Sequence, residues 1–168
     1  MSPREADHDL LEAGAREAAE AILRLARQES ARLVAAGREP VGNVMVRVGP
    51  RAVIIGFTVS GGVGGPFAIA MSEDAGRTLA AAMMGRTAPA GEKLGKRAVA
   101  ALAELGNIAA SAFMNGAAEL LHQSCLPSVP SLAVGDPAEL LPKALSGRSQ
   151  AQVARVEVGG VQVELLLA

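Results

Sequence analysis

The sequence predicts an α/β fold built from two pseudo-symmetric halves, each a long helix followed by three strands. Three observations support this: long stretches with apolar residues at helical spacing, glycine-rich turns between β-branched runs, and the same order of elements in both halves. Short turns between neighbouring runs indicate antiparallel strands. We therefore expect an antiparallel sheet packed against two long helices, in a single domain over residues 1–168.

The first half opens with a predicted helix over residues 5–36, where leucines and isoleucine recur near helical spacing and Gly37 marks the end. Valines alternate with other residues over 41–48, and this period of two predicts the first strand. The β-branched run within residues 52–59 predicts a second strand that is covered on both faces.

A glycine-rich segment, residues 60–66, connects that strand to a third one at 67–71. It lacks the Gly-Lys-Ser/Thr of a phosphate-binding loop, so a hairpin is the favoured interpretation. Ser72 then caps a helix whose first turn is acidic, as the helix dipole favours. Residues 86–91, which include Pro89, predict a linker between the halves.

The second half repeats this order. A long helix is expected over residues 92–123, a strand over 128–134 and a short helix over 136–145. Two final strands, 151–158 and 161–167, are joined by a Gly-Gly pair that is typical of a tight hairpin.

Composition excludes several classes of function. The formal net charge is −1 and no basic stripe is present, so nucleic acid is not an expected partner. Cys125 is the only cysteine, which rules out an intramolecular disulfide and fits a reducing cytosol. No leader-like segment and no uncharged apolar run of about 20 residues occur, so we expect a cytoplasmic protein without a membrane span. His8 and His122 are far apart, and no metal site of its own is expected.

The polar pair Glu104 and Asn107 is the most informative feature of the chain. Residues three apart share a helix face. A helical wheel separates an apolar arc from a polar one that holds Lys96, Arg97, Glu104, Asn107, Ser111 and Asn115. The alanines at 100, 103 and 110 flank the pair, so we expect a carboxylate and a carboxamide to stand on a shallow, approachable surface.

Glu-x-x-Asn, followed by twenty-two residues and then Pro130, resembles the signature of the CheC/CheX/FliY family of chemotaxis phosphatases. The resemblance includes Gly106 inside the motif and Ser128-Val129 before the proline. The family usually carries Ser or Asp four residues before the Glu, whereas this chain has Ala100. Among such proteins it is similar to the single-site, CheX-like members, because Ala15 stands where a first-half motif would need Asn and Arg38 where it would need Pro.

The resemblance implies hydrolysis of the aspartyl phosphate of a CheY-like response regulator. Asn107 would orient the attacking water and Glu104 would dock the regulator by pairing with its lysine. Pro130 and Gly106 would shape the site, and the Mg²⁺ would belong to the regulator. A CheD-like protein and a second copy of the chain are further possible partners. The fold implied is the CheC-like one.

Two alternatives stay open. On spacing alone, the pair is explained by a solvated helix face. Against this, Asn costs about half a kcal/mol relative to Ala inside a helix and Gly about 0.8–1.0 kcal/mol, so their presence side by side calls for another reason. The second alternative is a non-catalytic CheC-fold adaptor or a binding module similar to flagellar switch proteins, and Ala100 is the feature that favours it.

Overall fold

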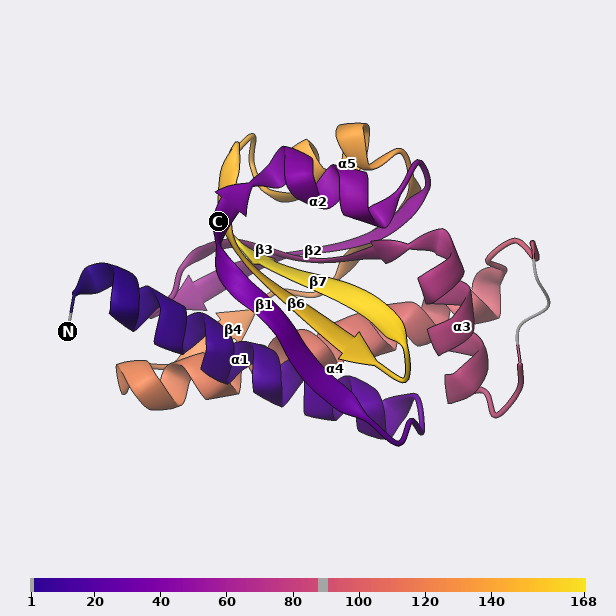
Figure 1. The fold of residues 1–168 in the computed structure, drawn as a ribbon, viewed down its shortest axis with the longest axis horizontal. Coiled ribbons are helices and arrows are strands. Elements are labelled where there is room, and N and C mark those ends of the chain that lie inside the picture. Colours follow the sequence, from indigo (N-terminus) through magenta and orange to yellow (C-terminus); the bar gives the residue numbers. More distant parts are fainter. Residues whose placement is uncertain (1, 88–90) are drawn as a thin grey trace.

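A seven-stranded sheet lies between two layers of helices in the computed structural model, which describes residues 2–87 and 91–168. The long helices α1 (Pro3–Leu25) and α4 (Lys96–Leu121) cover one face of the sheet, side by side and running in opposite directions (Figure 1). The short helices α2 (Val41–Val48) and α5 (Pro137–Ala144) cover the other face. The remaining elements are β1 (Ala31–Pro40), β2 (Ala52–Gly61), β3 (Gly65–Ser72), α3 (Glu73–Met83), β4 (Cys125–Pro127), β5 (Ser131–Gly135), β6 (Gln150–Val158) and β7 (Val161–Leu167).

The pairing of strands exchanges elements between the two halves. The sheet order is β1-β6-β7-β3-β2-β4, and β5 also pairs with β2. Strand β1 of the first half thus pairs with β6 of the second, while β5 of the second half pairs with β2 of the first. All the pairs are antiparallel. The predicted fold class is confirmed: pseudo-symmetric halves, an antiparallel sheet and two long helices packed on it.

The first predicted helix is wrong beyond residue 25. Arg27 has a φ of 52°, which ends the helical path, and residues 31–40 form β1 in register with β6. Gly37 lies inside this strand opposite Val153 and ends no helix. The alanines of this segment have high helix propensity, but propensity is a weak preference that pairing with a neighbouring strand overrides.

The predicted strand at 41–48 is also wrong, because this segment is helix α2. Val41, Val44 and Val48 are buried at helical spacing, whereas Val46 is 81% exposed. The valines fit a period of two and a helical period about equally well, and over eight residues the pattern could not separate them. The two errors compensate in number, so the first half still contributes three strands.

The second half needs smaller corrections. Helix α4 begins at Lys96 and ends at Leu121, inside the predicted 92–123 range. The strand predicted at 128–134 begins only at residue 131, as β5, and residues 128–130 are not part of a strand. The short strand β4, residues 125–127, was not predicted. The final hairpin, the glycine-rich hairpin between β2 and β3, and helices α3 and α5 occur where expected. Pro89 of the predicted linker lies outside the described residues.

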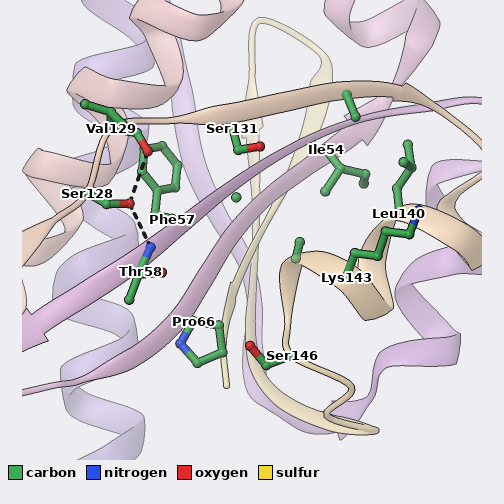
Figure 2. A pocket seen from close by; sticks show the side chains of 13 residues that line it. Ile54, Phe57, Thr58, Pro66, Ser128, Val129, Ser131, Leu140, Lys143 and Ser146 are labelled. Atoms are coloured by element: carbon green, nitrogen blue, oxygen red, sulfur yellow. Dashed lines mark hydrogen bonds between the residues drawn. The ribbon is translucent and has the colours of Figure 1, made fainter.

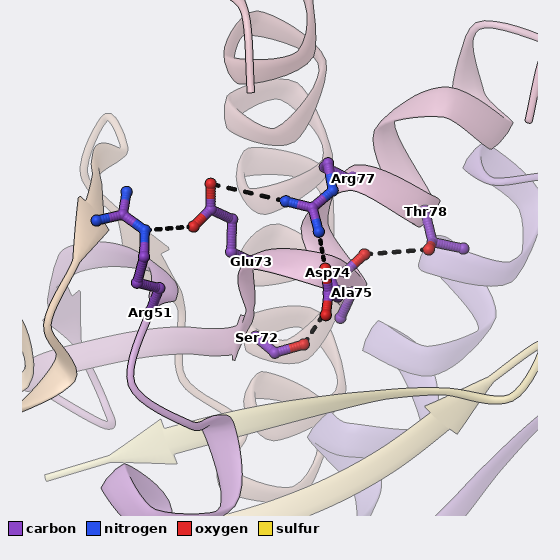
Figure 3. Close-up of polar contacts among 7 residues, drawn as sticks. All are labelled: Arg51, Ser72, Glu73, Asp74, Ala75, Arg77 and Thr78. Atoms are coloured by element: carbon purple, nitrogen blue, oxygen red, sulfur yellow. Dashed lines mark hydrogen bonds and ion pairs between the residues drawn. The ribbon is translucent and has the colours of Figure 1, made fainter. Parts of the chain in front are cut away.

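Helix α3 packs against α4, and polar contacts fix its first turn. The hydroxyl of Ser72 accepts a hydrogen bond from the backbone N–H of Ala75 at 3.0 Å, which caps α3 as predicted (Figure 3). Glu73 pairs with Arg51 at 2.6 Å and with Arg77 at 3.7 Å, tying the start of the helix to the loop before β2.

Two apolar clusters make up the core. The larger one lies between the sheet and helices α1 and α4, and includes the Phe67 and Phe113 rings at 4.8 Å between centroids. Glycines bring the two helices together: a Cβ on Gly14 would be 2.9 Å from the Phe113 ring, and one on Gly116 would be 2.8 Å from the Ala13 carbonyl oxygen. The smaller cluster lies under α2 and α5.

Candidate functional site

Helix α4 has one face against the core and one face toward solvent. Leu102, Leu105, Ala109 and Phe113 are fully buried. Glu104 and Asn107 are both exposed, as the helical wheel predicts. The position of the pair is therefore confirmed, while the roles of its side chains stay predictions.

Gly106 sets how closely α4 approaches the sheet. A Cβ at this position would lie 2.8 Å from Cδ1 and 2.9 Å from Cγ2 of Ile55 on β2. The close contact is made with a strand of the sheet. Gly106 thus lets the turn that carries Glu104 and Asn107 lie directly on β2.

Neither side chain of the pair is used for internal contacts within the described residues. Glu104 makes no ion pair, and no side-chain hydrogen bond involves Glu104 or Asn107. Side chains three apart on a helix have Cβ atoms about 5–6 Å apart, so one partner surface could engage both. The carboxylate and the carboxamide are free to bind water or a partner.

The surroundings of the pair are small or apolar. Ala100 is exposed one turn before Glu104, and Ala103 is half-buried. Ala110 is fully buried and does not flank the surface, contrary to expectation. Ile108 is 37% exposed next to Asn107 and was not singled out from the sequence. It lies 100° from Asn107 on the wheel, at the border of the polar arc, and that position is the signal that could have found it.

Pro130 lies in the break between β4 and β5, where the chain returns to pair with β2. Leu132, two residues further on, pairs with Ile55, the residue under Gly106. The proline therefore precedes the strand that runs beside the sheet position supporting the motif. Because proline lacks an N–H, it cannot continue the ladder from β4 into β5. The part of Pro130 in shaping the site stays a prediction.

The equivalent positions of α1 do not present an exposed Glu and Asn pair. Ala15 is fully buried, and Glu12 is half-buried and pairs with His8 at 3.2 Å and Arg16 at 3.8 Å. Strand registers pair Gly37 with Val153 and Ala133 with Ile54 at equivalent places of the two halves. Gly37 is thus equivalent to Ala133. Three residues before them stand Val34 and Pro130, so the equivalent of Pro130 is Val34 and not Arg38.

We expect Ala15→Asn to create no second site. Its carboxamide would enter the core between the helices, where a polar group without a partner costs about 1–3 kcal/mol. Thermal or chemical unfolding of the variant should show this loss of stability. An Asn at 15 that leaves stability unchanged and doubles activity would contradict the single-site interpretation.

The described residues contain no group of three or more His, Cys, Asp or Glu that could hold a metal ion. Helix α4 is long and apolar enough to cross a membrane by length and composition alone. It is packed on the sheet, however, and core helices of soluble proteins pass the same test.

Substituting Gly106 by alanine tests how α4 is seated. Alanine gains about 0.8–1.0 kcal/mol of helix propensity, but the clash with Ile55 is an overpacking that costs about 1–3 kcal/mol. We expect a net loss of stability in urea unfolding. Ile55→Val removes the nearest atom, so the double variant should lose less than the sum of the two single variants. Strict additivity would contradict this packing.

Residues 98–134 match the model of the CheC-like family. This segment contains Glu104, Asn107 and Pro130. No curated protein matches the chain by sequence.

Solved structures share the fold over nearly the whole chain. FliY from Thermotoga maritima has a TM-score of 0.78 at 15% identity, covering 100% of this chain and 91% of that chain. A chain of the CheX–CheY–BeF3–Mg²⁺ complex from Borrelia burgdorferi has a TM-score of 0.69 at 19% identity, covering 96% and 97%. A chain of the FliG–FliM complex from H. pylori has a TM-score of 0.72 at 9% identity, covering 99% and 94%.

At these identities the likeness to solved structures establishes the fold alone. The fold and the family match over residues 98–134 together confirm the resemblance to the CheC/CheX/FliY family.

Proposed function

We propose that this protein hydrolyses the aspartyl phosphate of a CheY-like response regulator in the cytoplasm. The observation behind the proposal is the exposed pair Glu104 and Asn107, unengaged within the described residues, in the segment that matches the CheC-like family. Transfer of a phosphoryl group to water depends mainly on positioning and on charge stabilisation. A protein that supplies two side chains on a rigid helix can provide both.

Asn107 orients the attacking water. Its carboxamide offers a carbonyl oxygen that accepts a hydrogen bond and an NH₂ that donates two. The side chain enters the regulator's acidic pocket, where it holds a water in line with the phosphorus. The Mg²⁺ is a ligand of the regulator and not of this chain.

Glu104 docks the complex by pairing with the regulator's lysine. We expect Glu104→Ala to weaken binding of the BeF3-activated regulator, because a partly desolvated pair costs about 2–5 kcal/mol when one partner is truncated. Isothermal titration calorimetry measures this directly. Glu119→Ala, at an exposed position in the C-terminal part of the same helix, is the control and should bind like the wild type. Equal affinity for Glu104→Ala and wild type would remove the docking role.

An adaptor without catalysis is the second candidate function. Ala100 favours it, since it replaces the Ser or Asp of related motifs on the exposed face, and the fold also occurs in the FliG–FliM complex. Phosphate release separates the two candidates, because an adaptor binds the regulator without shortening the lifetime of its phosphoryl group. The CheD-like partner and the homodimer stay predictions.

A further inference from the structure

A pocket of about 330 Å³ lies on the face of the sheet opposite to α4, between β2, β5 and α5 (Figure 2). We call it the second-half pocket; its lining includes Ile54, Gly56, Ser131, Ala133, Leu140 and Lys143. Lys143 is the one charged residue among the thirteen that line it. In Figure 2 its side chain lies beside Leu140, on the α5 side of the pocket.

The first half has the equivalent hollow, of about 110 Å³, between β1, β6 and α2. Strand registers relate the two places pair by pair. The pair Gly56 and Ser131 on β2 and β5 is equivalent to the pair Arg155 and Ala35 on β6 and β1. In the same way, Ile54 and Ala133 are equivalent to Val153 and Gly37. All eight residues line the hollows: Ile54, Gly56, Ser131 and Ala133 in one, and Ala35, Gly37, Val153 and Arg155 in the other.

The helices above the hollows follow the same relation. Each has eight residues and begins two residues after the equivalent strand positions Glu39 and Gly135. Arg47 of α2 is therefore equivalent to Lys143 of α5. Each hollow is therefore lined by one basic residue of the short helix above it, Lys143 in the second half and Arg47 in the first, at equivalent helix positions.

Carboxylates of the chain itself engage the basic group of the first half. Arg47 forms ion pairs with Glu39 and with Glu164, which is only 2% exposed, and Glu164 pairs across the strands with Arg155. In the second half Gly135 stands in place of Glu39, Ala68 in place of Glu164 and Gly56 in place of Arg155. These small residues leave space, and Lys143 has no ion-pair partner among the described residues.

We propose that the second-half pocket binds a small aliphatic monocarboxylate, whose carboxylate pairs with Lys143 as Glu39 and Glu164 pair with Arg47. The alkyl chain lies on the apolar lining made by Ile54, Ala133 and Leu140. The volume is at the small end of ligand pockets, about 300–1,000 Å³. The lining combines apolar side chains with hydroxyl groups and the Lys143 ammonium, which suits a ligand with an alkyl chain and one charged end. A single cation suits a monoanion better than a phosphate. The proposal is independent of the phosphatase function.

Hexanoate is the probe, with hexanol, hexylamine and inorganic phosphate as comparisons. Titration of the ¹⁵N-labelled full chain, followed by amide chemical shifts, should show saturable shifts for Gly56, Ser131 and Ala133 with hexanoate, with a Kd in about the millimolar range. Hexanol and hexylamine should bind at least about fivefold more weakly, because they lack the charge that Lys143 attracts. Absence of saturable shifts in these residues, or equal binding of hexanol, overturns the proposal, as does preferential binding of phosphate.

Two variants locate the carboxylate and the alkyl chain. Lys143→Met should weaken hexanoate binding at least about fivefold and leave hexanol binding unchanged. The exposed Lys93→Met is the matched control and should bind hexanoate like the wild type. Gly56→Ala puts a Cβ at ordinary contact distance, 3.4 Å from that of Ala144, so it folds but fills part of the pocket and should weaken both ligands. Unchanged hexanoate binding in Lys143→Met overturns the proposal.

Discussion

Replacing Asn107 by alanine is expected to slow phosphate release from the cognate phosphorylated regulator by at least about tenfold, or 1.4 kcal/mol in the barrier. The carboxamide is the group proposed to hold the attacking water, and alanine cannot replace either of its hydrogen-bonding functions. Because Asn107 is exposed and without a described side-chain contact, stability should stay the same or rise slightly through helix propensity. The measurement is the rate of phosphate loss at saturating regulator.

Asn115→Ala is the matched control. It removes the same side chain from another exposed position of α4, two turns further along. It should release phosphate at the wild-type rate. Binding of the BeF3-activated regulator should be similar for Asn107→Ala and wild type, so that the defect appears in turnover. Equal rates for Asn107→Ala and wild type would remove the proposed role of this side chain.

Replacing Arg47 by methionine is expected to give the largest loss of stability, about 3–5 kcal/mol, because it leaves the buried Glu164 carboxylate without its main partner. Glu39, on the other side of the guanidinium, would then repel it. Urea unfolding measures the loss. Arg38→Met, on the exposed side of β1, is the control and should cost little.

The pH dependence of this variant has a definite sign. Burial raises the pKa of Glu164, and the hydrogen bond and charge of Arg47 act against that rise. Without Arg47 the pKa rises further above its unfolded value, so the folded state holds the proton more tightly. Stability is then lost as pH rises through the range between the two values. The deficit of Arg47→Met should therefore shrink when the pH is lowered from about 7.5 to about 5.

Glu164→Gln in the Arg47→Met background should recover part of the stability at neutral pH, because a neutral amide replaces the unpaired charge. A deficit that is independent of pH and is not relieved by this second substitution would mean that packing of the Arg47 stem, and not charge, dominates.

Helices and strands were predicted correctly from the sequence where a turn motif, a capping residue or a run of β-branched residues allows only one interpretation. The Gly159-Gly160 hairpin, the Ser72 cap and the β-branched run of β2 each admit one interpretation, and the structure agrees with all three. Segments 31–40 and 41–48 failed for a common reason. Alanine-rich and valine-rich runs of this length fit both a helix and a strand, and the choice is made by β6 and by the sheet under α2, which are distant in sequence.

The candidate site was predictable as a position on a helix face, because Glu104 and Asn107 depend only on the helical period of one long helix. The contacts that hold this helix face in place could not be predicted from the sequence. The contact of Gly106 with Ile55 joins residues 51 positions apart, and the register of β5 on β2 places Pro130. The second-half pocket could not be predicted from the sequence. It forms because β5 of the second half pairs with β2 of the first, and the repeated order of elements does not indicate which strands pair.

The most direct test of the phosphatase proposal is the rate at which CheY-like response regulators of the same organism, once phosphorylated, lose phosphate in the presence of substoichiometric wild-type protein. We predict that one regulator loses its phosphate several-fold faster than it does alone, with each molecule of this protein acting more than once. A protein that binds a phosphorylated regulator and leaves the lifetime of its phosphoryl group unchanged would contradict the proposal and identify an adaptor.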